Sequence, residues 1–90
     1  MRKDLSKSQQ AVQAGHAVAE YLLRGPFTFW GNGTLVYLGV RDKEELTHWN
    51  SRITDFGYET AEFYEPDMDN EITAFAVECD EGLVKRLKLL

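Results

Sequence analysis

The chain has 90 residues, a net charge of −5 and one cysteine, Cys79. This length predicts one domain with a small core, because such a chain buries only about 60–65% of the surface that its unfolded form exposes. No apolar run approaches the roughly 20 residues that cross a bilayer, and the polar N-terminus shows no signal peptide. The negative charge argues against non-specific nucleic-acid binding, and one cysteine, which allows no internal disulfide, is typical of the reducing cytoplasm.

Basic residues gather at the two ends of the chain. Arg2, Lys3 and Lys7 stand at the start, and Lys85, Arg86 and Lys88 stand near the finish. If the two ends are neighbours in space, they form a local basic patch on an otherwise acidic protein. If they are not, these residues are solvated ends of the chain or of a helix.

The first predicted element is a helix over residues 6–24. Ser6 followed by Gln9 fits a capping box, in which each side chain satisfies the other residue's exposed N–H group. The predicted buried face is the stripe Ala11, Ala14, Val18, Tyr21 and Leu22. A second face carries the polar side chains Gln9, Gln13, His16 and Glu20. Gly25 and Pro26 end the helix.

An aromatic loop and an apolar run follow this helix. Residues 27–33 close in a turn dipeptide and hold Phe27, Phe29 and Trp30. The run 34–40 is nearly all apolar, which predicts a strand that is buried on both faces.

A second helix is expected between Asp42 and Gly57. Asp42 with Glu45 is a capping signal, and Gly57 is a suitable residue just beyond the C-terminus of a helix. The predicted buried stripe is Leu46, Trp49, Ile53 and Phe56.

The rest of the chain predicts two strands and a closing helix. Residues 58–65 and 71–78 alternate apolar and polar side chains, and the two strands can form a hairpin or straddle another strand. Asp80 caps a short final helix with Leu83, Leu87 and Leu90 at helical spacing.

These elements predict a single small α/β domain over residues 1–90. It has three layers, with a mixed sheet of three to four strands and helices on both faces. Such a domain normally centres its sheet on an opening strand, but only Met1 to Asp4 precede the first helix. The opening strand is therefore expected to be reduced or missing.

Three residues are candidates for chemistry, and each has a plainer interpretation. His16 could exchange protons near neutral pH, but a histidine on a helix more commonly packs or faces solvent. Asp67 could orient a histidine or a water, or it could be ordinary turn chemistry, as Asp69 and Asn70 are expected to be. Thr73 could hold a water or a carbonyl group, or could simply favour a strand.

Histidine and cysteine are too sparse in this chain for a metal centre. Two separated histidines and one cysteine match no zinc spacing. His48, beside Trp49 on the second helix, is interpreted as structural or exposed. We therefore expect no metal and no cofactor.

Five short segments follow one another in a specific order along the chain. Residues 2–5 read Arg-Lys-Asp-Leu, residues 11–17 read Ala-Val-Gln-Ala-Gly-His-Ala, residues 65–67 read Glu-Pro-Asp, residues 72–74 read Ile-Thr-Ala and residues 87–90 read Leu-Lys-Leu-Leu. In this order they resemble the Arg-x-Asp-Leu, Ala-Gln-x-x-His-Ala, aspartate-loop, threonine-strand and Leu-Lys-Leu motifs of the type 2 peptidyl-tRNA hydrolases. The resemblance covers almost the whole chain.

The resemblance implies hydrolysis of the ester bond between a peptide and tRNA by an activated water. It implies His16 as the general base or water positioner, Asp67 as its orienting partner and Thr73 as a water or carbonyl contact. It also implies Lys7 as a residue of the catalytic site, which with Arg2 or Lys3 attracts the terminal phosphates. Arg2, Lys3 and Gln13 are the implied substrate-binding residues. Peptidyl-tRNA is the expected partner, no membrane is expected, and a homodimer is a candidate assembly because a small core gains from one.

The chain also departs from the family pattern. The lysine expected just before the helix falls on Gln9, and Lys7 is the nearest replacement. The loop at Asp67 is short and lacks a second threonine, and the opening strand is nearly gone. The alternative function is therefore a catalytically impaired member of the same fold that binds RNA or protein. A third interpretation is an acidic interaction module with the aromatic loop as its contact surface.

Overall fold

The computed structural model describes residues 1–24, 35–85 and 88–89. Its elements in chain order are α1 (Lys7–Leu23), β1 (Leu38–Gly39), α2 (Lys43–Asp55), β2 (Thr60–Glu65), the 3₁₀ turn η1 (Pro66–Met68), β3 (Glu71–Val77), the 3₁₀ turn η2 (Glu81–Leu83) and β4 (Lys88–Leu89). The aromatic loop expected at residues 27–33 lies outside the described residues.

The opening strand is reduced to residues 1–3, and this short segment links two pairs of strands. β2 pairs with β3, and β1 pairs with β4, each antiparallel. Residues 1–3 run parallel to β1: Val40 N–H donates to the Met1 carbonyl and Lys3 N–H donates to the Val40 carbonyl, each at 2.7 Å. On the other side, Arg2 N–H donates to the Thr73 carbonyl at 3.4 Å. The segment therefore lies between β1 and β3, as the prediction of a reduced strand requires.

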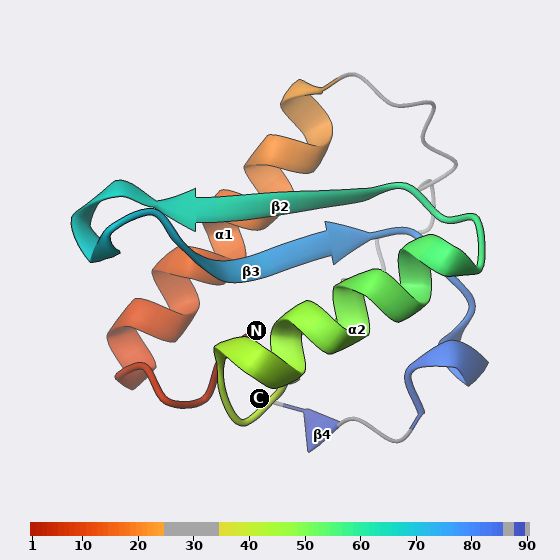
Figure 1. The fold of residues 1–90 in the computed structure, drawn as a ribbon, viewed down its shortest axis with the longest axis horizontal. Coiled ribbons are helices and arrows are strands. Elements are labelled where there is room, and N and C mark those ends of the chain that lie inside the picture. Colours follow the sequence, from red (N-terminus) through yellow and green to blue (C-terminus); the bar gives the residue numbers. More distant parts are fainter. Residues whose placement is uncertain (25–34, 86–87, 90) are drawn as a thin grey trace.

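The two long helices cover opposite faces of the β2–β3 hairpin, as Figure 1 shows. On one face Thr73 of β3 reaches Gln13 of α1, and on the other its neighbour Ile72 packs with Leu46 of α2. The prediction of a mixed α/β domain with helices on both faces is confirmed. The last two predicted strands are hairpin neighbours.

The capping box at the start of α1 forms as predicted. Gln9 N–H donates to the Ser6 hydroxyl at 3.2 Å, and Ser6 N–H donates to the Gln9 side-chain oxygen at 3.0 Å. These bonds satisfy N–H groups that the first helical turn leaves without a partner. The side-chain oxygen of Gln9 is thereby committed to capping the start of the helix.

The buried face of α1 differs from the predicted stripe. Gln13, Ala14 and Ala17 are buried, whereas Ala11 and Leu22 are exposed. The reason is that polar Gln13 finds hydrogen-bond partners in the hairpin, so the helix turns that side chain inward. The alanines beside it leave room for the close approach of helix and sheet.

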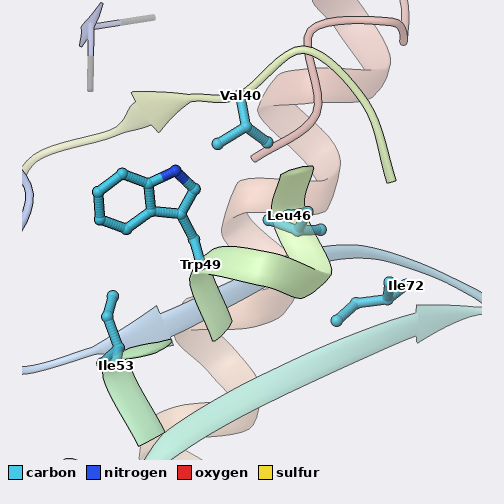
Figure 2. Close-up of a cluster of buried hydrophobic side chains, with 5 residues drawn as sticks. All are labelled: Val40, Leu46, Trp49, Ile53 and Ile72. Carbon is cyan, nitrogen blue, oxygen red and sulfur yellow. The ribbon is translucent and has the colours of Figure 1, made fainter. Parts of the chain in front are cut away.

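The helix α2 supplies most of the hydrophobic core. Asp42 accepts a hydrogen bond from Glu45 N–H at 3.0 Å, which starts the helix where the sequence predicts. Figure 2 shows the core cluster: Val40, Leu46, Trp49, Ile53 and Ile72. Burial of one such aliphatic side chain contributes about 1.5–3 kcal/mol, so this stripe accounts for the position of α2.

The end of α2 corrects one member of its predicted stripe. Phe56 is 61% exposed because the helix has already ended there, and the chain turns at Gly57 with φ of 95°. That backbone conformation favours glycine, which has no Cβ.

Two predicted elements are wrong: the strand over 34–40 is shorter than expected, and the closing helix does not form as predicted. Of the strand expected over 34–40, Leu38–Gly39 pair with β4 and Val40 bridges to Arg2, whereas residues 35–37 are exposed. In place of the closing helix, the chain makes the short η2 turn and then β4. β4 pairs with β1, so these residues satisfy backbone groups of a segment about 50 positions away rather than their own helical turns.

Among the described residues, Arg24 lies along the edge of β2 that does not pair with β3. The Arg24 guanidinium donates to the carbonyl oxygens of Thr60 and Glu62, at 3.4 and 3.2 Å, and to the Glu62 carboxylate at 3.4 Å. These carbonyls are two residues apart and face away from β3. Arg24 thus occupies groups that another strand would otherwise pair with.

Candidate functional site

Most of the predicted site residues gather where β2 ends and β3 begins, beside the first half of α1. Gln13 and His16 come from α1, Asp67 comes from η1 directly after β2, and Thr73 comes from β3. Glu65, the last residue of β2, completes the group. These residues are up to 60 positions apart in the chain.

An irregularity in the hairpin directs Thr73 toward α1. Phe63 pairs with Ala74 and Tyr64 pairs with Ile72, so Thr73 is an extra residue on β3. A bulge of this kind changes the direction of side chains along its strand. Ile72 therefore lies in the core beside α2, while Thr73, the next residue, faces α1.

A buried hydrogen-bond chain joins α1 to the hairpin. Thr73, which has no exposed surface, donates its hydroxyl to the Gln13 side-chain oxygen at 2.6 Å. The Gln13 amide nitrogen donates to the Glu65 carboxylate at 3.4 Å. Because an unpaired polar group in this position would be costly, the chain fixes the distance between α1 and the start of the Asp67 loop.

His16 is exposed and lies flat against Phe63. Their ring centroids are 4.3 Å apart and the ring planes differ by 6°. Within the described residues the imidazole has no hydrogen-bond partner, and no hydrogen bond or ion pair joins it to Asp67. The ring is therefore oriented by Phe63, and its nitrogens remain open to solvent or to a ligand.

Asp67 is exposed on η1, two residues beyond Glu65. The turn that follows it is closed by Asp69 and Asn70, with φ of 54° and 59°, and Asn70 N–H donates to the Glu65 carbonyl at 2.9 Å. This left-handed pair confirms the expected turn chemistry, because Asp and Asn tolerate that conformation better than most residues. Asp67 takes no part in that backbone bond and faces solvent.

Arg2 is buried and its hydrogen-bonding groups are occupied. It donates to both oxygens of the Asp4 carboxylate, at 2.9 and 2.6 Å, to the Glu71 carboxylate at 3.0 Å and to the Ile72 carbonyl at 3.2 Å. These hydrogen bonds lower the pKa of Asp4 and of Glu71, since both favour the ionised carboxylate. The structure thus gives Arg2 a role within the sheet, where the resemblance implied substrate binding.

The two lysines implied for the site are exposed and stand apart from His16. Lys7 is nine residues before His16 in the same helix. At about 100° per residue, it lies roughly half a turn around α1 from the imidazole. Lys3 is exposed in the segment before α1. The loop itself is acidic, since Glu65, Asp67, Asp69 and Glu71 fall within residues 65–71.

Phe63 and Glu65 are site residues that sequence reasoning missed. They stand two apart on β2, and their partners His16 and Gln13 stand three apart on α1. A strand places residues i and i+2 on one face, and a helix does so for i and i+3. The two spacings were readable in the sequence, but which strand meets which helix face was not.

The charged side chains of the described part of the chain do not form a metal site of three or more His, Cys, Asp or Glu ligands. A cavity of about 740 Å³ lies elsewhere, between α1, β1, α2 and β3. Its lining is mainly apolar and ranges from buried side chains such as Leu46 to exposed ones such as Leu35, and none of the predicted site residues contributes to it. We assign it no function.

No protein-family model, no curated protein and no solved structure matches this chain. Its function must therefore be argued from the site described above.

The Thr73–Gln13 hydrogen bond predicts a measurable coupling between α1 and β3. Thr73→Val keeps the shape but leaves the Gln13 oxygen buried without a donor, which should lower the free energy of unfolding by about 1–3 kcal/mol. Gln13→Leu combined with Thr73→Val should cost less than the sum of the two single changes. Urea unfolding of the four proteins measures this. Thr47→Val, on the exposed side of α2, is the control, and additive costs would contradict the coupling.

The Arg2 ion pairs predict a loss of stability in acid. Unfolded carboxyl groups titrate near about pH 4, and those of Asp4 and Glu71 titrate lower in the folded chain. Below about pH 5 the unfolded chain therefore binds more protons, and the stabilisation is lost as pH falls through the folded pKa values. The urea midpoint should fall less steeply between about pH 5 and about pH 3 in Asp4→Asn than in the wild type. Asp55→Asn, which removes an exposed carboxyl group, is the control. If the urea midpoint of Asp4→Asn fell with pH as steeply as that of Asp55→Asn, the prediction would be contradicted.

Proposed function

We propose that this chain hydrolyses the ester bond between a peptide and tRNA, as a short, divergent member of the type 2 peptidyl-tRNA hydrolase family. The observation that carries the proposal is the Thr73–Gln13–Glu65 hydrogen-bond chain, which is buried at Thr73 and Gln13. It holds the helix that bears His16 against the hairpin that leads to Asp67, and it leaves His16 exposed. The order of motifs along the sequence supports the same assignment.

In the proposed reaction His16 acts as the general base. A water oxygen bonds to the ester carbonyl carbon while the imidazole takes the water's proton. The carbonyl oxygen carries the negative charge of the tetrahedral intermediate. When the carbonyl re-forms, the bond to the ribose oxygen breaks and the imidazolium returns the proton to that oxygen. The products are a peptide carboxylic acid and a free tRNA hydroxyl.

The other residues have supporting roles in this proposal. Asp67 faces solvent near the hairpin end, where it can orient the water or balance the charge of the imidazolium. Thr73 is fully buried and donates to Gln13, so its proposed role is that of a positioning residue rather than a substrate contact. Lys3, exposed before α1, and Lys7, exposed at the start of α1, are proposed to contact phosphates away from the ester.

A second candidate function is binding without hydrolysis, and two contacts favour it. The Gln9 side chain, at the position where the family has a lysine, is committed to the capping box. Arg2 is committed to carboxylates. The site region thus has little free positive charge to stabilise the oxyanion that forms when the ester is hydrolysed. Saturable binding of peptidyl-tRNA without cleavage would favour this candidate.

The proposal places the protein in the cytoplasm, which is consistent with free Cys79, and includes a homodimer as its candidate assembly. No helix among the described residues is long and apolar enough to cross a membrane. The edge of β2 that has no strand partner among the described residues is the candidate surface for a strand-paired dimer, and Arg24 occupies part of it.

The general-base role predicts that His16→Ala lowers the turnover number by about 10²–10⁴-fold, because positioned proton transfer contributes that much. The measurement is release of free tRNA from N-acetylated aminoacyl-tRNA by purified protein. His48→Ala, which removes the exposed histidine of α2, is the matched control and should keep wild-type turnover. Asp67→Ala should also lose activity.

Unchanged turnover in His16→Ala would exclude His16 as the base. An inactive wild type whose circular dichroism shows a folded protein would exclude the hydrolase and leave the binding function.

Lys7 as a phosphate contact predicts an effect that depends on salt. Lys7→Ala should leave the turnover number unchanged, because the Lys7 side chain lies roughly half a turn around α1 from His16. It should lower kcat/KM at low salt and reduce by about 1 the slope of log kcat/KM against log salt concentration. Arg52→Ala, which removes an exposed cation from the last turn of α2, is the control. A drop in turnover at all salt concentrations would instead place Lys7 at the chemistry.

A further inference from the structure

Two histidines of this chain are exposed on helices and each lies beside an aromatic ring, but the two pairs differ in geometry. His16 and Phe63 are stacked, with centroids 4.3 Å apart and an interplanar angle of 6°. His48 and Trp49 meet edge to face, at 6.5 Å and 80°. In the first pair alone, one whole face of the imidazole is covered by an aryl ring while the residue remains exposed.

Phe63 is held by the sheet and not by His16. It is half-buried on β2 and pairs across the hairpin with Ala74, which is 1% exposed. His16 in turn is carried by α1, which the Gln13 hydrogen bonds join to the same hairpin. The imidazole is therefore already stacked on Phe63 before any ligand arrives, which lowers the entropic cost of stacking another ring on it.

The charge around this platform selects the kind of ring. Four carboxylates fall within residues 65–71, and the nearby Arg2 is paired with two carboxylates. A phosphate would be repelled here, whereas a neutral planar group would not. Nucleobases are neutral, and stacking on aromatic side chains is the usual way in which proteins hold unpaired bases without using charge.

We infer that the outer face of the His16–Phe63 pair is a stacking site for an unpaired nucleobase, the terminal adenine of tRNA. This inference rests on the proposed function, because the ester bond is borne by the ribose attached to that base. With the adenine over the imidazole face, the ribose lies beside the ring edge, where the nitrogens are free of protein partners. Stacking then orients the ester toward the base that activates water, and the phosphates trail away from the acidic loop.

The test separates the ring of His16 from its proton chemistry. His16→Phe keeps a flat ring on Phe63 but has no nitrogen, so it should bind adenosine as the wild type does while failing to hydrolyse. His16→Ala should bind adenosine about 5- to 140-fold more weakly, which is the range for loss of one base stack. His48→Ala is the control and should bind as the wild type does.

Adenosine itself is the probe, followed by the NMR shifts of the His16 ring protons in the wild type and of the α1 amides in all variants. Saturable shifts centred on residue 16, weaker for uridine and absent for methyl riboside, are the expected result. Equal binding by His16→Phe and His16→Ala would overturn the inference, as would no saturable shift up to the solubility limit. Binding of N-acetyl-phenylalanine amide at His16 in place of adenosine would also overturn it, by assigning the platform to the peptide.

The outcomes for the two proposals are distinct. Hydrolysis that depends on His16, without ring-dependent adenosine binding, rejects the stacking site and keeps the hydrolase. Ring-dependent adenosine binding without any hydrolysis rejects the hydrolase and keeps the stacking site as a binding function.

Discussion

The rest of this structure depends on the insertion of Arg2 between two pairs of strands. Its backbone bridges to Val40 on one side and to Thr73 on the other, and its guanidinium is satisfied by Asp4, Glu71 and the Ile72 carbonyl. A buried guanidinium is tolerated only when it is paired and hydrogen-bonded in this way. In the part of the chain that the structure describes, this contact joins the β1–β4 pair to the β2–β3 hairpin through backbone hydrogen bonds.

The same contact supports the candidate site. Arg2 holds the start of β3, at Glu71 and Ile72, directly before the bulge at Thr73. The bulge turns the threonine hydroxyl to Gln13, and Gln13 reaches Glu65 at the end of β2. A structural arginine therefore fixes a hydrogen-bond chain, and that chain fixes the helix that presents His16. This gives the Arg-x-Asp segment a physical role that does not require contact with substrate.

The electrostatics of the site limit which interactions could contribute to the proposed binding of RNA. The protein carries a net charge of −5, and the loop beside His16 is rich in carboxylates. Long-range attraction of phosphates cannot then supply most of the affinity, since that term requires free cations. Under the proposed function, such a site relies on contacts that are insensitive to charge, and the stacked, exposed imidazole offers one.

The sequence by itself determined the elements whose signals are local. The capping box at Ser6, the N-cap at Asp42, the stripe Leu46, Trp49 and Ile53, and the turn at Asp69 and Asn70 depend on residues within a few positions, and all are present in the structure. Tertiary structure alone decided the burial of Gln13, the truncated strand before Val40 and the replacement of the closing helix by β4. Each of these depends on a partner tens of residues away: Gln13 on Thr73, and β1 on β4. Short-range periodicity carries no information about such partners, because a polar group is buried, or a strand paired, only when the fold brings a hydrogen-bond partner to it.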